Sequence, residues 1–211
     1  SRPDDLSVLR SCASVGQSEL IHAWKSALSA HDFLAAQILL TREDFNEEAR
    51  SIKVKETIDS LLERGVVPVV NENDSISDEE LKFGDNDILS ALLASLTQAE
   101  LLIILTTAKG LMTSVNSGVL VPFVSEINAE IEKMAEGTTS PTAMGGMATK
   151  IEAAKVATKS GCAVFIGCGE TPGRLPQIIE GKTEGTFFAP AGLELKQRKK
   201  WLAFFPNPQG S

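Results

Sequence analysis

The sequence contains little that would indicate a secreted, membrane-spanning or metal-binding protein. Its three cysteines (Cys12, Cys162 and Cys168) are odd in number and lack the paired spacing of metal ligands. They predict buried thiols in a reducing compartment rather than a disulfide framework. No apolar run approaches the roughly 20 residues that span a bilayer, and residues 1–5 do not resemble a signal peptide. These absences predict a cytoplasmic protein without membrane contact.

Positive charge and histidine are also scarce. The chain has 20 Lys and Arg against 28 Asp and Glu, which gives a formal net charge of -8. Binding to a nucleic-acid backbone needs clustered basic residues, so we expect no nucleic-acid partner. The two histidines, His22 and His31, have no carboxylate pattern near them, which argues against a metal site or a catalytic triad.

The residues that are present describe an ordinary globular protein. The chain has 211 residues, of which 43% are hydrophobic and 23% charged, which suits one ample domain. We expect that domain over residues 1–205 and a loose tail over residues 206–211. Apolar runs predict strands, and helical patterns lie between them; the strands are expected at 37–41, 66–70, 101–105, 163–166 and 186–188.

The strands and helices alternate along the chain, and this order indicates the fold class. The strands are apolar throughout, which is typical of a parallel sheet buried on both faces. We therefore predict an α/β fold with a mostly parallel central sheet sandwiched between helix layers. Gly16 is expected to interrupt the first helix, and Pro68 indicates a strand end, bulge or edge. Helices are expected at 6–29, 45–63, 88–96, 126–135 and 149–159.

Two polar clusters flank the segment that follows the strand at 66–70. Residues 71–74 read Asn-Glu-Asn-Asp, and residues 84–87 read Gly-Asp-Asn-Asp directly before a helix. Ligands collect at the carboxyl ends of parallel strands, and such side chains can bind an ammonium or a carboxylate group, or orient lysines and a metal. Either cluster alone is explained as turn and cap chemistry; the two together favour a polar-ligand site.

Two further segments suit a phosphate ligand. Residues 106–111, which follow the strand at 101–105, offer hydroxyls and backbone amides. Residues 145–150 read Gly-Gly-Met-Ala-Thr-Lys and lead into a helix, where glycines and free amides admit a phosphate and Lys150 can bridge it. The spacing is not that of a P-loop. Taken alone, each segment also fits an ordinary connection.

In running order, these motifs resemble those of the glutamate 5-kinases, which are amino acid kinases. The resemblance covers essentially the whole chain. Its main segments are 68–74, 84–91, 104–111 and 145–150, with supporting matches at 14–17, 39–42, 185–186 and 198–201. It implies that ATP, as its Mg²⁺ complex, phosphorylates the side-chain carboxylate of L-glutamate in the first step of proline synthesis. It also implies proline as a feedback inhibitor and a homo-oligomer, dimeric or tetrameric.

The resemblance also assigns roles to individual residues. Asp74 and Asn86 match glutamate-binding residues, and Asn71, Glu72 and Asn73 lie beside them in the motif. Asp87 matches a carboxylate that orients catalytic lysines, and Lys150 matches the residue that stabilises charge on the moving phosphoryl group. It gives the chain no metal ligand, and it assigns ATP contacts to Thr106, Thr107, Met144, Gly145, Gly146, Met147, Ala148, Thr149 and Lys150.

The chain departs from the family pattern in three places. It lacks the opening Lys-x-Gly-Ser type loop and the Ser-Ser-Gly-Ala segment that follows it, so we expect the N-terminal part of the kinase domain to be missing; it also lacks the PUA domain that some members append. Thr107 stands where the family usually has Asp, and Ala143 and Met144 replace a Gly-Thr pair. Two other interpretations stay open. One is a related kinase for aspartate, acetylglutamate, carbamate or a nucleoside monophosphate; the other is a non-catalytic sensor of glutamate, proline or ATP.

Overall fold

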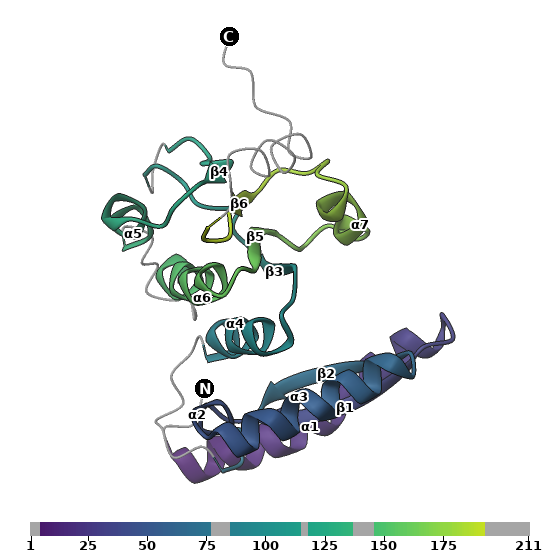
Figure 1. The fold of residues 1–211 in the computed structure, drawn as a ribbon. Helices are drawn as coiled ribbons and strands as arrows, with labels where there is room; N and C mark the ends of the chain where they lie inside the picture. The colour runs from purple at the N-terminus through teal and green to yellow at the C-terminus, as the bar shows by residue number, and fades with distance from the viewer. Residues whose placement is uncertain (1–4, 77–84, 115–117, 137–145, 193–211) are drawn as a thin grey trace. The chain divides into compact units, whose positions relative to one another are not determined.

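The computed structural model describes residues 5–76, 85–114, 118–136 and 146–192 (Figure 1). The chain divides into two compact units, Ser1–Leu89 and Ser90–Ser211, which are described here one at a time. The predicted tail at 206–211 lies outside the described residues, and the domain boundary at 205 stays a prediction. No helix among the described residues is long and apolar enough to cross a membrane.

The first unit is built on one parallel pair of strands. β1 (Leu34–Leu40) and β2 (Val66–Glu72) pair in register from Leu34 opposite Val66 to Leu40 opposite Glu72. Parallel neighbours need a crossover, and α2 (Glu43–Asn46) with α3 (Glu48–Glu63) provides it. The N-terminal helix α1 (Leu6–Ser29) precedes this unit's strands. The strands predicted at 37–41 and 66–70 are therefore present, each with slightly different bounds.

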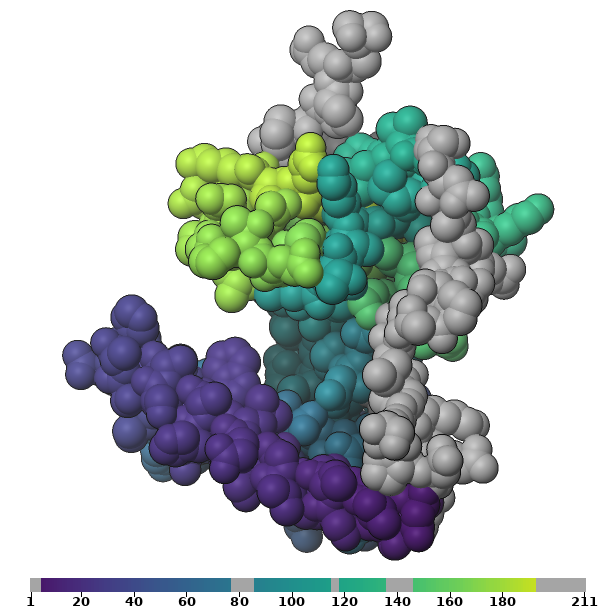
Figure 2. Space-filling view, turned by 180° about the vertical axis from the view of Figure 1, so that it is seen from behind, coloured from purple at the N-terminus to yellow at the C-terminus, as the bar shows by residue number. Residues whose placement is uncertain are grey.

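The expected interruption of the first helix at Gly16 is wrong. α1 continues unbroken from its N-cap Asp5, whose carboxylate accepts a hydrogen bond from the Ser7 amide at 2.8 Å. No residue of α1 is fully buried, and Figure 2 shows this helix, in purple, as a ridge of side chains along the first unit. A glycine costs a helix only about 0.5–1 kcal/mol relative to alanine, which the other 23 residues of this 24-residue helix outweigh.

The second unit holds a four-stranded sheet in the order β3-β5-β6-β4. β3 pairs with β5 and β4 with β6 in parallel, whereas β5 and β6 are antiparallel. Together with the first unit, this confirms the predicted α/β fold with mostly parallel sheets. Helix α4 (Asp85–Thr97) begins in the first unit and continues into the second. The other elements of the second unit are β3 (Leu101–Thr106), β4 (Phe123–Val124), α5 (Ala129–Glu136), α6 (Met147–Lys159), β5 (Ala163–Cys168), α7 (Arg174–Ile179) and β6 (Thr186–Phe188).

The core of the second unit lies around β5 and β6. Phe165, Phe187 and Phe188 are at most 1% exposed, and the rings of Phe123 and Phe187 stack with centroids 5.9 Å apart. Helix α6 packs against β5 and contributes small buried side chains, which let the helix approach the sheet closely. These are Ala153, Ala154 and Ala157.

The three cysteines have different environments. Cys162 is 2% exposed, and burial raises the pKa of its thiol, which fits the expected inert core residue. Cys168 is half-buried at the end of β5, and Cys12 is exposed on α1. The expectation of buried thiols is therefore correct for Cys162 and wrong for Cys12.

A buried hydroxyl joins the loop after β3 to β6. The Thr186 side chain is fully buried, and its Oγ1 accepts a hydrogen bond from the Leu111 amide at 2.8 Å. Gly110 permits this contact, because a Cβ there would lie 2.7 Å from Thr186 Oγ1. The backbone at Gly110 has a φ of 149°, a conformation that favours glycine.

Two glycine substitutions test this description of the packing. In Gly185→Ala the new Cβ would lie 2.0 Å from Cζ of the buried Phe165 ring, so we expect a loss of about 1–3 kcal/mol in the free energy of unfolding. In Gly16→Ala the Cβ meets nothing within 4 Å, and we expect a gain of about 0.5–1 kcal/mol. Urea unfolding midpoints measure both. Equal effects of the same sign would contradict the structure at these positions.

Candidate functional site

The first polar cluster lies at the carboxyl end of β2. Asn71 and Glu72 are the last two residues of this strand, and the chain then turns through Asn73 and Asp74. The Asn73 amide donates to the Leu40 carbonyl at 2.8 Å, which continues the parallel pairing one residue beyond β2. Residues 71–74, which the sequence assigned to glutamate binding, are therefore held at the end of β1 by a backbone hydrogen bond.

Side-chain amides link this segment to two helices. Asn86 Nδ2, at the start of α4, donates to Asn71 Oδ1 at 2.9 Å. Asn71 Nδ2 donates in turn to Gln17 Oε1 of α1 at 2.9 Å. The structure thus brings together Asn71 and Asn86, two of the predicted site residues, and fixes which way the Asn71 amide faces.

Gln17 and Ser14 were missed as members of this cluster. Ser14 Oγ lies 2.8 Å from Ser75 Oγ, next to the predicted Asp74. The sequence carried one signal for them, because residues 14–17 form one of the supporting motif matches. The motif did not predict a role for Gln17 or Ser14, because Gln17 contacts Asn71, which lies 54 positions away in the sequence.

The carboxylate residues assigned to this site are Glu72, Asp74 and Asp87. All three are half-buried, and each has interaction partners within the protein. Asp87 lies in the first turn of α4, two residues after the helix begins at Asp85. Acidic side chains are favourable at such a position because the helix start carries partial positive charge.

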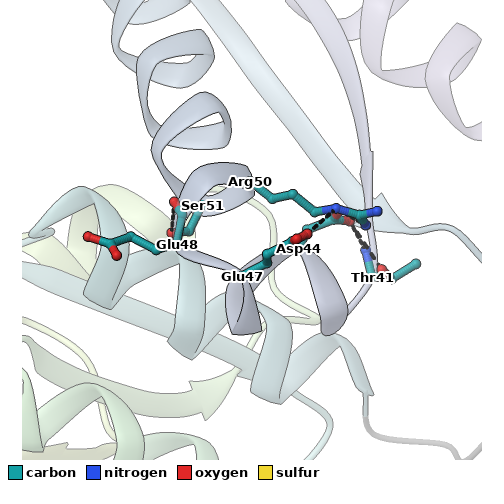
Figure 3. Close-up of polar contacts among 6 residues, drawn as sticks. All are labelled: Thr41, Asp44, Glu47, Glu48, Arg50 and Ser51. Atoms are coloured by element: carbon teal, nitrogen blue, oxygen red, sulfur yellow. Dashed lines mark hydrogen bonds and ion pairs between the residues drawn. The ribbon is translucent and has the colours of Figure 1, made fainter.

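A second set of contacts fixes the turn after β1 (Figure 3). Thr41 donates to Asp44 Oδ2 from its amide at 2.8 Å and from its hydroxyl at 3.1 Å. Arg50 of α3 reaches Asp44 Oδ1 at 3.3 Å and Glu47 Oε2 at 2.7 Å. Arg50 is 54% exposed, so each pair contributes only about 0.2–1 kcal/mol. Their main effect is to hold the end of β1, to which the Asn73 backbone is hydrogen-bonded.

The second unit places its own predicted residues at a strand end. Thr106 ends β3 opposite Cys168 of β5, and the Gly169 amide donates to the Thr106 carbonyl at 2.9 Å. Thr106 Oγ1 accepts from the Ala108 amide at 3.5 Å, whereas Thr107 is exposed. The loops after these two parallel strands therefore begin at the same edge of the sheet.

The start of α6 carries most of the residues assigned to ATP. Gly146 is the N-cap and makes no side-chain cap bond, and Thr149 Oγ1 donates to the Gly146 carbonyl at 2.8 Å. Met147 and Lys150 are buried, at 6% and 8% exposure, while Ala148 is exposed. Met144 and Gly145 lie outside the described residues. A buried lysine is rare, so Lys150 does not belong to a solvated helix face.

No metal centre is evident in the part of the chain that the structure describes. Within those ranges, no three His, Cys, Asp or Glu side chains lie close enough together to hold a metal ion. The residues assigned to glutamate fall within the first unit, and Thr106 with the α6 residues falls within the second.

Curated relatives of this chain are glutamate 5-kinases. The enzyme from Myxococcus xanthus is 42% identical over the whole chain, and that from Citrifermentans bemidjiense is 43% identical over the whole chain. The chain covers 57% of each of these two proteins, so it spans just over half the length of the relatives it matches.

Solved structures and a family model agree with this result at the level of the fold. Carbamate kinase from Giardia lamblia bound to AMP-PNP superposes with a TM-score of 0.56 at 16% identity, covering 86% of this chain and 75% of that one. UMP kinase from Ureaplasma parvum gives 0.52 at 12% identity, covering 79% and 65%. The model of the amino acid kinase family matches residues 3–168. The chain therefore belongs to the amino acid kinase family.

Proposed function

We propose that the protein transfers the γ-phosphoryl group of ATP to the side-chain carboxylate of L-glutamate. A carboxylate oxygen attacks the γ-phosphorus, the bond to the β,γ-bridging oxygen breaks, and ADP leaves, so that γ-glutamyl phosphate forms. In this proposal the reaction is the first step of proline synthesis. The names and identity levels of the relatives support it. The structural observation that carries it is the burial of Lys150 in the first turn or so of α6.

The donor half of the reaction is assigned to the start of α6. Gly146 leaves the first backbone amides uncapped by a side chain, and a Cβ at this position would meet nothing within 4 Å. A phosphate can therefore approach these amides, where the helix also carries partial positive charge. Lys150 adds a full charge in a site that is shielded from water, where electrostatic stabilisation of a transition state is strongest.

The acceptor half is assigned to the cluster at the end of β2. Asn71 and Asn86 each use one amide hydrogen within the network, and an asparagine amide has a second N–H that can meet the α-carboxylate of an amino acid. Asp74 and Glu72 provide carboxylates for the ammonium group. Asp87 is assigned to orient lysines rather than to hold substrate. With amides for the α-carboxylate and carboxylates for the ammonium group, the cluster suits a small zwitterion.

The remaining elements of the proposal concern ATP and the whole protein. Thr106, Thr107 and residues 144–149 contact ATP, and Mg²⁺ arrives as part of the MgATP substrate. Phosphoryl transfer depends mainly on positioning and charge neutralisation, so these residues act by placing the phosphates. Proline inhibition, a homo-oligomeric state and a cytoplasmic location stay predictions from the sequence.

An acceptor panel tests the proposed reaction. The complete gene product is assayed for ADP release with glutamate, aspartate, acetylglutamate, carbamate and UMP, and hydroxylamine traps any acyl phosphate. We expect turnover and a hydroxamate with glutamate. Turnover with another acceptor alone would indicate a related kinase. ATP or glutamate binding without any turnover would indicate a sensor, and both results would overturn the proposal.

Replacement of Lys150 tests the donor half. Lys150→Ala in the complete protein is expected to lower kcat by about a hundredfold or more, as for loss of one preorganised charge, while the KM for glutamate changes much less. Lys150→Arg is expected to rescue poorly, because a planar guanidinium does not replace an ammonium in a confined site. The matched control is Lys159→Ala, at the exposed end of the same helix. A folded Lys150→Ala protein within about threefold of the wild-type kcat would refute this role.

Replacement of acceptor residues tests the other half. Asp74→Ala and Asn86→Ala are each expected to raise the KM for glutamate roughly ten- to a hundredfold, since each removes a hydrogen bond to a charged group. The affinity for ATP should change far less. Steady-state kinetics with each substrate varied gives both constants, and Glu56→Ala, at an exposed position of α3, serves as the control. Unchanged glutamate dependence in both variants would remove these residues from the site.

A further inference from the structure

Helix α1 contacts the polar cluster at the end of β2 through two side chains on one of its faces. Ser14 and Gln17 are three residues apart, a spacing that places both on the same side of a helix. Their partners are Ser75 and Asn71, which lie on either side of residues 72–74 in the sequence. Helix α1 therefore contacts both ends of the segment assigned to glutamate.

The side-chain hydrogen bonds of Asn71 have a defined direction. Its Oδ1 accepts from Asn86 Nδ2 and its Nδ2 donates to Gln17 Oε1, each at 2.9 Å. If the Asn71 amide turned over, its oxygen would face the Gln17 oxygen, and its NH₂ group would face that of Asn86. Both hydrogen bonds would then be lost. Gln17 and Asn86, as they stand in the structure, therefore allow only one orientation of the Asn71 amide.

This orientation leaves one N–H of Asn71 for a ligand, within the part of the chain that the structure describes. An asparagine NH₂ group has two hydrogens, and Gln17 takes one of them. Without the Gln17 oxygen the amide can turn over, and the Asn71 oxygen would then repel a carboxylate that the N–H had bound. Asn71 and Gln17 are both half-buried, so water replaces a lost partner less readily than at an exposed position.

The contact of Ser14 holds the other end of the segment more weakly. Ser14 Oγ donates to the Arg10 carbonyl at 2.9 Å. A serine hydroxyl has a single hydrogen, so Ser75 Oγ is the donor in its 2.8 Å contact with Ser14 Oγ. Both serines are exposed, and water can take the place of either hydroxyl. Gln17 is therefore the main link between α1 and the cluster.

We propose that Gln17 is a positioning residue that acts through Asn71 and sets the affinity for the α-carboxylate of the substrate. Gln17 holds the Asn71 amide with an N–H toward this carboxylate and does not itself touch the substrate. The contact between Ser14 and Ser75 limits the motion of the same segment. The inference rests on the proposed function, because it takes the cluster at the end of β2 as the glutamate site.

Replacement of Gln17 by residues of similar length tests the proposal in the complete gene product. Gln17→Met removes the oxygen that accepts from Asn71 and is expected to raise the KM for glutamate about five- to tenfold. The α-carboxylate does not react, so kcat should stay within about twofold. Gln17→Glu keeps an accepting oxygen and should restore the KM to within about threefold of wild type. Gln37→Met, at an exposed position of β1, is the matched control, and urea midpoints check that each variant is folded.

A double-mutant cycle distinguishes positioning from a general loss of packing. Asn71→Ala alone is expected to raise the KM for glutamate roughly ten- to a hundredfold. If Gln17 acts only through Asn71, the double variant Gln17→Met/Asn71→Ala stays within about twofold of Asn71→Ala. Independent effects would multiply instead. A KM that equals the product of the two single effects would overturn the proposal.

Two glutamate analogues identify the substrate group that depends on Gln17. Glutarate keeps both carboxylates and lacks the ammonium group, whereas 4-aminobutyrate keeps the ammonium group and lacks the α-carboxylate. Each is measured as a competitive inhibitor against glutamate. Gln17→Met should raise the inhibition constant of glutarate by the same factor as the KM for glutamate, and should leave that of 4-aminobutyrate within about twofold. An equal loss for both analogues would show that the substitution disturbs the whole site and would overturn the proposal.

The proposed function and the role of Gln17 fail in different measurements. Absence of glutamate turnover by the wild-type protein in the acceptor panel would refute the proposed function. A KM for glutamate in Gln17→Met equal to that of the wild-type protein would refute the role of Gln17 alone. If the protein binds glutamate without turnover, calorimetric Kd values replace KM in the same double-mutant cycle and are read in the same way.

Discussion

Two backbone hydrogen bonds hold the polar loops of this protein at the ends of its parallel strands. The Asn73 amide donates to Leu40 and the Gly169 amide donates to Thr106, each one residue beyond a parallel pair. In both units this hydrogen bond extends the parallel pairing by one residue, so the first residue of the loop is held beside the neighbouring strand. Because Asn71, Glu72 and Thr106 end such strands, their placement depends on sheet pairing more than on their own contacts.

Lys150 shows how the fold and the proposed chemistry oppose each other. A cation at 8% exposure is expensive to remove from water, and alanines on the same helix contribute to packing at no such cost. The shielding that makes the residue costly for folding also strengthens its action on a developing negative charge. Such conflicts between stability and function are expected at sites where a protein binds or transfers charged groups.

The sequence predicted the elements whose hydrophobic pattern is strong. β6 was expected at 186–188 and is found there, and β3 and β5 follow from continuous apolar runs. β5 is buried as expected, whereas β3 is only partly buried, with Leu105 44% exposed. β4 has two residues, too few for any periodicity, and α7 contains Pro176, which hides a helical pattern. The helix expected from residue 126 begins at Ala129, because Asn128 Oδ1 accepts hydrogen bonds from the amides of Glu130 and Ile131 and caps it.

Part of the candidate site could also be predicted from the sequence. Contact between Asn71 and Asn86 follows from a strand end and a helix start that are 15 residues apart. The partner of Asn71 on α1 depends on how helices rotate and pack. Hydrophobic periodicity identifies the buried face of a helix, but it does not predict which neighbouring element contacts the polar side chains beside that face.

The contact between Thr186 and the loop after β3 has a consequence for the evolution of this chain. The hydroxyl of Thr186 meets the Leu111 amide only because position 110 has no side chain. Positions 110 and 186 are therefore coupled: a larger residue at 110 displaces the hydroxyl, and an apolar residue at 186 leaves a buried amide without a partner. Either substitution alone gives a less stable protein, so we expect proteins descended from this one to retain both residues or to replace both together.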